Sequence, residues 1–346
     1  MTIFILGIPM PCGGGNTETL DTAIMWKNAG IDVRFLYIEG CNCGNKPAHP
    51  GDDNPAVAEL AKREIPVVGG CVTGLHLVPY LRDSIVVAFN NKHAPHLWPE
   101  LKAMGCRMVY SPCMSWVSRN EFDFTDHPPT AIHYHTDFQF ERIHAQWYAW
   151  GVREFAHIHG APATMEFHPR HRRDDAFVVG RLARCARAKW SPRIWEILGA
   201  VRDRGVAVSA MVMGWNNMLS QCCGKPPEWA TAMPENTISS KPFYRMCHTM
   251  ICPNWGLAEN YPRVGLEAMA AGVPLVVDAM GGWPELCGDA ALYAKTAEEY
   301  VEHLISLATD EDLRQDAIYR GWLRLSQIAN PVVLANEWAQ LFARLS

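Results

Sequence analysis

The stretch CPNWGLAENYPRVGLEAMAAGVPLVVDAMGGWPEL occupies residues 252–286 of the 346-residue chain and indicates its fold class. The apolar residues 250–252 predict the end of a strand, and residues 253–261 predict a loop. Pro262 suits the first turn of a helix, and Gly272, followed by Pro274, marks the end of that helix. The stretch therefore predicts a strand, a loop and the N-terminus of a helix.

The predicted helix N-terminus is suited to binding an anion. Its backbone N–H groups and the positive end of its dipole face the crevice above the carboxyl edge of the sheet, where a phosphate fits. Glu259 lies in the loop before the helix, and Glu267 lies one to two turns inside it. Both carboxylates can accept hydrogen bonds from sugar or ribose hydroxyls. The alternative is that Glu259 is a solvated loop residue and Glu267 an exposed helix position.

The two glutamates form an E-x7-E pattern, and LEAMAAGVPLVV followed by GGWPEL completes the segment. This segment resembles the retaining GT-B enzymes of glycosyltransferase family 4. The resemblance implies that Glu259 contacts the transferred sugar and that Glu267 holds the ribose hydroxyls. It also implies that the run between them holds the sugar and the diphosphate; this run is Asn260, Tyr261, Pro262, Arg263 and Val264. Many relatives have Gly-Phe-Gly in place of the first three, which leaves the donor sugar open.

A second similarity to this family lies in VVGRLARCARAKWSP, residues 178–192. In the family, an arginine directly after the glycine and a lysine several residues later neutralise the donor diphosphate. Arg181 and Lys189 occupy these positions, and positive charge is needed there because the leaving diphosphate gains negative charge. The spacing is longer than in many relatives, so Arg184 or Arg187 is an alternative to Lys189. A solvated basic turn is the structural alternative.

A glycine loop follows the first predicted strand. Gly13, Gly14 and Gly15 precede a helix that we expect to be capped by Asn16 or Thr17. The loop matches neither a dinucleotide fingerprint nor a P-loop, and a plain tight turn is the alternative. In the related enzymes a glycine-rich loop at this place faces the donor, which implies that role for Gly14 and Gly15. Many relatives also carry a histidine after a middle strand, whereas here residues 108–110 run into SPCMSW.

The first half of the chain alternates short β-rich runs with amphipathic stretches. Helical patterns cover residues 17–28, 55–63, 95–104 and 138–150, and strands are predicted at 2–8, 33–38, 67–68, 85–89, 108–110 and 132–134. This alternation is typical of parallel βαβ units. Residues 1–160 are therefore predicted to form a Rossmann-like domain, and the resemblance implies that this domain binds the acceptor.

A second alternating series follows the proline- and histidine-rich residues 161–176, which we predict to be a linker. Residues 177–328 are predicted to form a second Rossmann-like domain, and the resemblance implies that this domain binds the nucleotide sugar. Asn330 and Pro331 form a cap and a first helical residue, so residues 329–346 are predicted to be a helix that packs back on the N-terminal domain. The fold class is thus α/β, a GT-B fold of two doubly wound parallel-sheet domains facing a central cleft.

Composition and charge narrow the function classes. Hydrophobic residues make up 49% of the chain and charged residues 19%, as in globular proteins. The formal net charge of −5 provides no global attraction for nucleic acid or anionic lipid. We find no apolar run long enough for a membrane span and no basic segment of a signal peptide at the start. We therefore expect a cytoplasmic protein.

Cysteines and histidines do not predict a metal site. The 12 cysteines are scattered and are expected to be reduced thiols. The histidine and cysteine pairs lack the spacing of a tetrahedral zinc site, so we expect no bound metal. The pairs are His133 and His135, His157 and His159, His168 and His171, Cys41 and Cys43, and Cys222 and Cys223.

The resemblance implies transfer of a sugar from a nucleoside-diphosphate sugar to an acceptor hydroxyl, with retention of anomeric configuration. The donor would be a UDP- or GDP-sugar, and no cofactor is required. The acceptor is a glycan, a lipid or a small molecule, or, with less support, a modified base in DNA. Two other hypotheses are a nucleotide-sugar epimerase of GT-B architecture and a catalytically idle nucleotide-sugar-binding protein.

Overall fold

The structure is a computed structural model that describes residues 2–7, 14–39, 55–71, 75, 78–91, 93–162, 176–254 and 256–346. The chain folds into two compact units, one of Met1–Pro162 with Ala329–Ser346 and one of Ala163–Ile328. Gly13, Cys41, Cys43, the histidines at 168 and 171, and most of the predicted linker lie outside the described residues.

The N-terminal unit contains a parallel sheet of seven strands in the order β3-β2-β1-β4-β5-β6-β7. The strands are β1 (Ile3–Leu6), β2 (Val33–Glu39), β3 (Val67–Cys71), β4 (Ile85–Phe89), β5 (Arg107–Ser111), β6 (Ala131–Tyr134) and β7 (Glu154–His157). The helices are α1 (Gly14–Asn28), α2 (Pro55–Lys62), α3 (Ala94–Ala103), α4 (Asp137–Ala149) and α12 (Pro331–Leu345).

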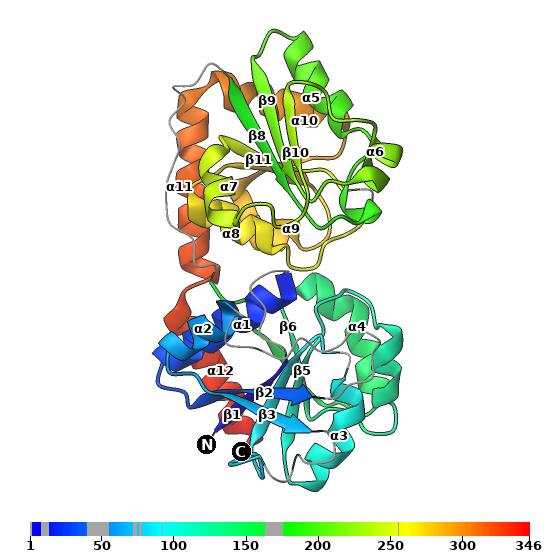
Figure 1. Ribbon diagram of the computed structural model, residues 1–346, viewed down its shortest axis with the longest axis vertical. Helices are drawn as coiled ribbons and strands as arrows, with labels where there is room; N and C mark the ends of the chain where they lie inside the picture. Colours follow the sequence, from blue (N-terminus) through cyan, green and yellow to red (C-terminus); the bar gives the residue numbers. More distant parts are fainter. Residues whose placement is uncertain are drawn as a thin grey trace. The chain divides into compact units, whose positions relative to one another are not determined.

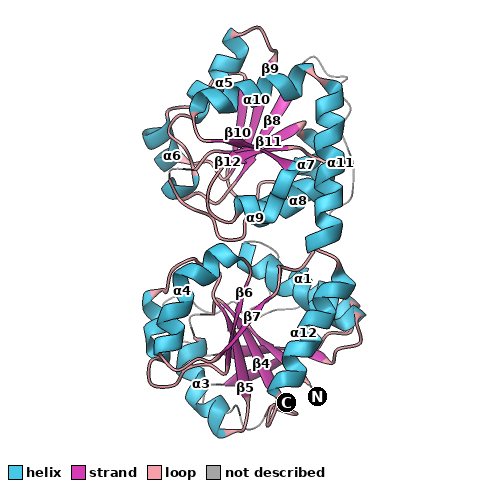
Figure 2. Ribbon diagram, turned by 180° about the vertical axis from the view of Figure 1, so that it is seen from behind, coloured by secondary structure: helices cyan, strands magenta, loops and turns pink. Residues whose placement is uncertain are grey.

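Both faces of this sheet are buried, because alternate residues of its apolar strands belong to two different core clusters. Ile3 and Ile5 of β1 pack in one cluster, while Phe4 and Leu6 pack in the other. Figure 2 shows helices on both sides of the strands in each unit. This double layer explains why the central strands are apolar runs rather than alternating sequences.

The C-terminal helix α12 packs on the N-terminal unit, beside α1 (Figure 1). Trp338 meets Trp26 of α1 edge to face, with ring centroids 4.9 Å apart. The Asn330 side chain accepts hydrogen bonds from the backbone N–H groups of Val332 and Val333, and Pro331 occupies the first turn. The predicted start of this helix is therefore confirmed.

The C-terminal unit contains six parallel strands in the order β10-β9-β8-β11-β12-β13. They are β8 (Phe177–Leu182), β9 (Val208–Met213), β10 (Ala230–Met233), β11 (Thr249–Cys252), β12 (Leu275–Asp278) and β13 (Ala291–Ala294). The helices are α5 (Ile194–Asp203), α6 (Asn217–Cys223), α7 (Ser240–Met246), α8 (Arg263–Ala271), α9 (Trp283–Cys287), α10 (Ala297–Thr309) and α11 (Glu311–Ile328).

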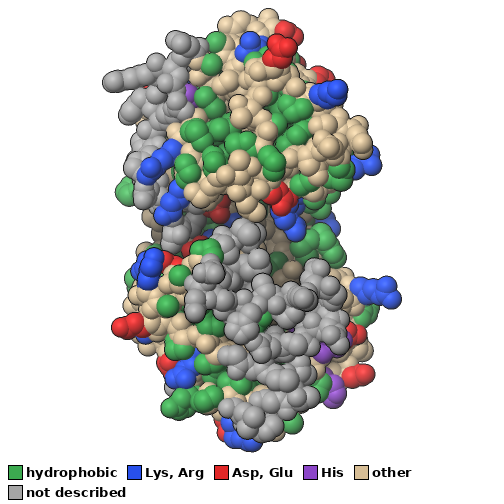
Figure 3. Space-filling view, viewed as in Figure 1, with side chains coloured by type: hydrophobic (Ala, Val, Ile, Leu, Met, Phe, Trp, Pro, Cys, Tyr) green, Lys and Arg blue, Asp and Glu red, His purple; other side chains and the backbone are tan. Residues whose placement is uncertain are grey.

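Hydrophobic side chains gather on the face of the C-terminal unit seen in Figure 3. A shallow cavity of about 280 Å³ is lined by Val178, Met211 and Met246 together with Ser209, Ala210 and Thr231. These residues come from β8, β9, β10 and the end of α7. Among the described residues, no helix is both long and apolar enough to cross a membrane.

The predicted α/β class with two parallel sheets is confirmed, and three local predictions are corrected. Helix α1 begins at Gly14, so Asn16 and Thr17 lie inside the helix rather than at its cap. Pro262 is the N-cap of α8, and the helix itself begins at Arg263. The edge strands β7 and β10 were not predicted. The predicted end of α8 is confirmed, because Gly272 has left-handed dihedral angles of φ 71° and ψ 35°.

Candidate active site

The strand order of the C-terminal unit places a switch point between β8 and β11. The chain leaves β8 toward β9 on one side, yet β11 returns to pair with β8 on the other side. In open α/β sheets, ligands bind outside the carboxyl ends of the strands at such a point. Arg181, near the end of β8, and Asn254, just after β11, therefore lie where a ligand site is expected.

Lys189 and Glu259 form an ion pair at this edge of the sheet. The Lys189 ammonium group donates to a carboxylate oxygen of Glu259, and the two side chains are 19% and 17% exposed. Burial lowers the pKa of Lys189 from its ordinary value, while the Glu259 carboxylate opposes this shift. Arg184 and Arg187 are exposed. Of these three cations, Lys189 is therefore the one that the fold brings to Glu259.

The Arg181 guanidinium lies beneath this ion pair and is only 2% exposed. One Nη atom donates to the carbonyl oxygen of Leu182 and to the Cys252 thiol, the latter over 3.3 Å. The other donates to the Lys189 carbonyl oxygen and, over 2.9 Å, to Oδ1 of Asn254. Burial raises the pKa of Cys252 to about 11, so this thiol is neutral. Arg181 thus ties strand β8 to the Lys189 turn and to the residue after β11.

Two glycines hold the loop that carries Glu259. Gly282 donates its N–H to the Glu259 carbonyl oxygen over 2.7 Å. A Cβ atom on Gly282 would lie 1.6 Å from the Asn260 carbonyl oxygen, and one on Gly281 would lie 2.5 Å from that of Glu259. Gly281 also has a φ of 65°. Only glycines allow the two backbones to approach so closely.

Glu267 lies on α8 and is hydrogen-bonded to a buried tyrosine. The Tyr244 hydroxyl donates to Oε2 of Glu267 over 3.0 Å. Burial raises the pKa of Glu267, whereas the charge of Arg263 and the Tyr244 hydrogen bond oppose the rise. Tyr244 comes from α7, so two helices fix the orientation of this carboxylate.

A third carboxylate, that of Asp278, lies at the end of β12. Its Oδ2 accepts from the backbone N–H of Asn254 over 2.9 Å, and its Oδ1 accepts from the Tyr300 hydroxyl over 2.7 Å. Burial raises the pKa of Asp278, and both hydrogen bonds and the nearby Arg181 oppose this effect. Asn254, Asp278 and Tyr300 were not singled out from the sequence. A polar residue directly after the apolar run of β12 was the available signal for Asp278.

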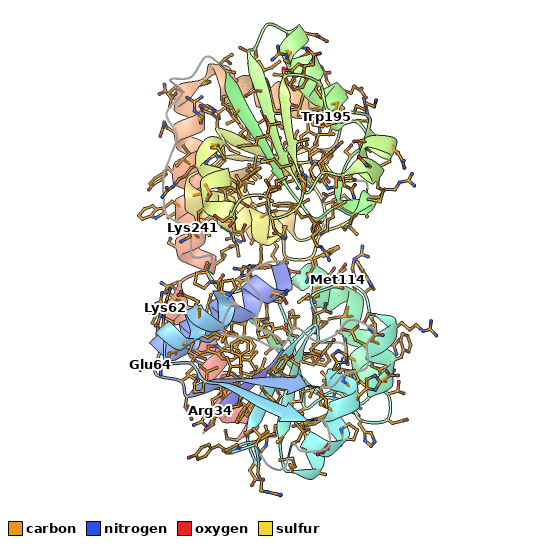
Figure 4. The ribbon with its side chains drawn as sticks, in the orientation of Figure 1. Arg34, Lys62, Glu64, Met114, Trp195 and Lys241 are labelled. Carbon is orange, nitrogen blue, oxygen red and sulfur yellow. The ribbon has the colours of Figure 1, made fainter. Side chains whose placement is uncertain are left out.

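A group of tryptophans supports the Lys189 turn from inside the unit. Trp190 is fully buried, and its ring meets Trp215 edge to face at 5.1 Å. Its indole N–H donates to the Arg184 carbonyl oxygen over 2.9 Å. Trp195 of α5, labelled in Figure 4, packs on Trp215 with centroids 5.0 Å apart. These contacts make the turn part of the core of the C-terminal unit rather than a solvated basic loop.

Gly14 and Gly15 belong to the N-terminal unit, where they form the first residues of α1. The Gly15 carbonyl oxygen accepts from the Thr19 hydroxyl over 2.6 Å. A Cβ atom on Gly15 would meet only the Cys113 sulfur, at an ordinary 3.7 Å. Space alone therefore does not require glycine at position 15.

The histidine pair on β6 is internal to the N-terminal unit. His133 is buried between the Ser111 hydroxyl and the Ile158 carbonyl oxygen, each 2.8 Å from a ring nitrogen. Burial lowers the pKa of His133 well below its ordinary value. His135 lies 3.9 Å from the buried Glu18 carboxylate, which also accepts from the Ala161 N–H over 2.7 Å. These histidines bind protein groups within the unit.

The fold is that of the GT-B glycosyltransferases, as structural comparisons show. Anabaena HepE in complex with UDP-glucose is 14% identical, with a TM-score of 0.68 over 99% of this chain and 100% of that chain. TarM gives a TM-score of 0.76 at 8% identity over 99% and 98% of the two chains. Sucrose-phosphate synthase from Thermosynechococcus elongatus gives 0.67 at 13% identity over 99% and 98%.

Within this fold, residues 237–323 match the family described as "Glycosyl transferases group 1". The matched segment contains Glu259, Glu267 and Asp278, together with helix α8 between the loop and β12. A search of curated proteins finds no match to the chain. The match to this family therefore lies within the C-terminal unit and covers about its second half.

Proposed function

We propose that the protein is a glycosyltransferase that moves a sugar from a nucleoside-diphosphate sugar to an acceptor hydroxyl with retention of anomeric configuration. One observation carries this proposal above the others. The Lys189–Glu259 pair lies at the carboxyl edge of the β8–β11 switch point, directly before helix α8, inside the unit that contains the match to the group 1 family. A cation and a carboxylate at such a point suit a diphosphate and a sugar, respectively.

Each donor group has a proposed partner in the C-terminal unit. Glu259 accepts hydrogen bonds from the transferred sugar, and Glu267 accepts from the ribose hydroxyls. Lys189 contacts the diphosphate at the surface of the site, and Arg181 adds positive charge from beneath it. The backbone at the start of α8 holds the sugar and the diphosphate; this segment comprises Asn260, Tyr261, Pro262, Arg263 and Val264.

The reaction proposed for this site needs no separate base. The bond between the anomeric carbon and the diphosphate oxygen breaks, and its electron pair stays on the leaving diphosphate. The acceptor oxygen forms the new bond on the same face of the sugar, and its proton passes to the leaving phosphate. Lys189 and Arg181 stabilise the negative charge that develops there, so the proposal includes no cofactor.

A uridine nucleotide is the proposed donor base. HepE was crystallised with UDP-glucose, and S. aureus TarM was crystallised with UDP, and both share the fold of this chain. A GDP-sugar is the second possibility to test. The acceptor hydroxyl is proposed to bind to the N-terminal unit. Gly14 and Gly15, the first residues of α1, keep the donor-binding role that the resemblance implies.

The test is turnover of UDP-glucose and GDP-glucose by the purified protein with a panel of glycan, lipid and small-molecule acceptors. We expect nucleoside diphosphate to be released and the product to keep the anomeric configuration of the donor, as read by proton NMR. Glu259→Ala and Arg181→Ala should each abolish turnover while the far-UV circular dichroism spectrum is unchanged. Near-normal turnover in both variants would overturn the proposed site. If the protein converts the donor to its epimer when no acceptor is present, the transferase proposal is overturned. Binding of UDP without any turnover would also overturn it.

A further inference from the structure

Arg181 is surrounded by protein acceptors on the side of both Nη atoms. Its guanidinium is 2% exposed, and the four contacts of its Nη atoms go to Leu182, Cys252, Lys189 and Asn254. A guanidinium in this state cannot offer both Nη atoms to a diphosphate without giving up contacts that it already makes. Its direct contact with the Lys189 turn is the hydrogen bond that one Nη atom donates to the Lys189 carbonyl oxygen. The position of Arg181 thus fixes the backbone of the residue whose ammonium group meets Glu259.

The position of Arg181 depends in turn on three residues behind it. Asn254 accepts from Arg181 through Oδ1, and its backbone N–H donates to Asp278. Tyr300, which is buried on helix α10, donates its hydroxyl to the other oxygen of Asp278. We call Arg181, Asn254, Asp278 and Tyr300 the edge network. It joins the ends of β8, β11 and β12 to a helix of the core.

Electrostatics explains why the residues of this network depend on one another. A buried guanidinium is stable only where acceptors and a counter-charge are near it. Asp278 supplies the nearby negative charge, and its two oxygens are held by one donor each from Asn254 and Tyr300. Loss of any member therefore leaves another buried polar group unsatisfied. The side-chain amide nitrogen of Asn254 is buried and has no hydrogen-bond partner among the described residues, so the Asn254 side chain is held through its oxygen alone.

We propose that Asn254, Asp278 and Tyr300 are positioning residues for donor turnover, which hold Arg181 and through it Lys189 in register with Glu259. This inference rests on the proposed function of the same site. None of the three need touch the donor. They act by placing a cation where charge develops in the transition state, and a displacement of about 1 Å in such a group can cost roughly a hundredfold in rate.

The test uses the full-length protein and the variants Asn254→Ala, Asp278→Asn and Tyr300→Phe. UDP-glucose turnover is measured as UDP release, UDP affinity by calorimetry and stability by thermal unfolding. We expect kcat to fall at least about tenfold, with the donor KM changed less than about threefold, because Lys189 acts mainly on the developing charge. Tyr293→Phe is the matched control. It removes a tyrosine hydroxyl that donates to the Gly288 carbonyl oxygen, and we expect it to keep wild-type kcat.

A double-mutant cycle separates positioning from simple destabilisation. In a Lys189→Ala background, Asn254→Ala and Tyr300→Phe should lower the remaining rate by a clearly smaller factor than in the wild type, because the Lys189 ammonium group that they position is gone and only the effect on Arg181 is left. Equal losses with and without Lys189, or wild-type kcat in all three variants, would overturn the positioning role while the transferase proposal stands. A wild-type protein that binds neither UDP nor GDP, and releases neither from UDP-glucose or GDP-glucose, would overturn both.

Discussion

The ammonium group of Lys189 is hydrogen-bonded to the carboxylate of Glu259, 70 positions further along the chain. The contact joins the turn after β8 to the loop before α8, within the C-terminal unit. Each partner neutralises the other while both are shielded from water on most of their surface. In the proposed reaction the diphosphate takes Lys189 and the sugar takes Glu259, so the donor replaces one internal ion pair with two external contacts.

Removing the Lys189 ammonium group is expected to reduce turnover strongly. Lys189→Ala should lower kcat by roughly 10²–10³, the usual cost of removing one group that stabilises developing charge. The matched control is Arg187→Ala, which removes an exposed cation from the same turn and should leave turnover near wild type. Steady-state UDP release measures both variants. A large loss in Arg187→Ala and none in Lys189→Ala would give the role to Arg187.

At alkaline pH, the decrease of kcat/KM for the donor should reflect deprotonation of Lys189. Burial lowers the pKa of this lysine, so the free protein loses the positive charge at a pH below that of an ordinary lysine. We expect kcat/KM for the donor to fall as pH rises through that lowered pKa. Lys189→Arg keeps its charge throughout the accessible range, so the decrease should disappear in any activity that this variant retains. An identical decrease in Lys189→Arg would assign it to another group.

Several elements were predicted correctly because each carries its signal locally. The strand β4 (Ile85–Phe89) was predicted with the bounds that the structure has, and the start of α12 at Pro331 was predicted from its cap. The two missed strands, β7 and β10, are both at the edges of their sheets. An edge strand is covered on fewer sides, and β10 has no fully buried residue. Its sequence ATAM therefore lacks the apolar run that reveals an interior strand.

The candidate site was predictable only where one segment contains the signal. Glu259 and Glu267 lie eight residues apart on a loop and the helix that follows it, so their proximity follows from sequence spacing. Asn254 and Asp278 are brought to Arg181 by the pairing of β8 with β11 and of β11 with β12. That strand order is a tertiary property, because it depends on how helices cover the two faces of the sheet. The edge network therefore required the structure.

Tyr244 should influence the pH below which UDP affinity is lost. Its hydroxyl stabilises the charged form of Glu267 and so partly offsets the rise in pKa that burial causes. Tyr244→Phe is therefore expected to raise the pKa of Glu267 further. Since ribose hydroxyls are proposed to bind the charged carboxylate, UDP affinity should be lost at a higher pH than in the wild type. Calorimetric titration of UDP across the acid range measures this, and loss of affinity at an unchanged pH would contradict the role of Glu267.

His133 should make the N-terminal unit sensitive to acid. Its folded-state pKa lies well below its ordinary value, so below about pH 6.5 the unfolded chain binds a proton that the folded unit does not. The free energy of unfolding should then decrease as pH falls, by up to about 1.4 kcal/mol per pH unit, until the folded pKa is reached. His133→Gln removes this slope even if it lowers stability throughout. Urea unfolding followed at several pH values measures it, and the exposed His96→Gln should retain the wild-type slope.

Gly282 should be indispensable for the placement of Glu259, for reasons of space alone. Its φ of −80° is open to any residue, but a Cβ atom would lie 1.6 Å from the Asn260 carbonyl oxygen. Gly282→Ala must therefore push the loop away and weaken the N–H contact to the Glu259 carbonyl oxygen. We expect turnover to fall by roughly 10² or more, because the glutamate leaves its position by about an ångström.

The same substitution at Gly199 provides the matched control for Gly282→Ala. Gly199 lies inside α5, and a Cβ atom there would meet nothing within 4 Å. Gly199→Ala should raise the free energy of unfolding by about 0.5–1 kcal/mol, because alanine loses less backbone entropy than glycine in a helix. Its UDP-glucose turnover should equal that of the wild type. Gly282→Ala should instead lose about 1–3 kcal/mol of stability through the steric conflict. Wild-type turnover in Gly282→Ala would mean that the Glu259 loop tolerates displacement, and the sugar contact would then have to come from another residue.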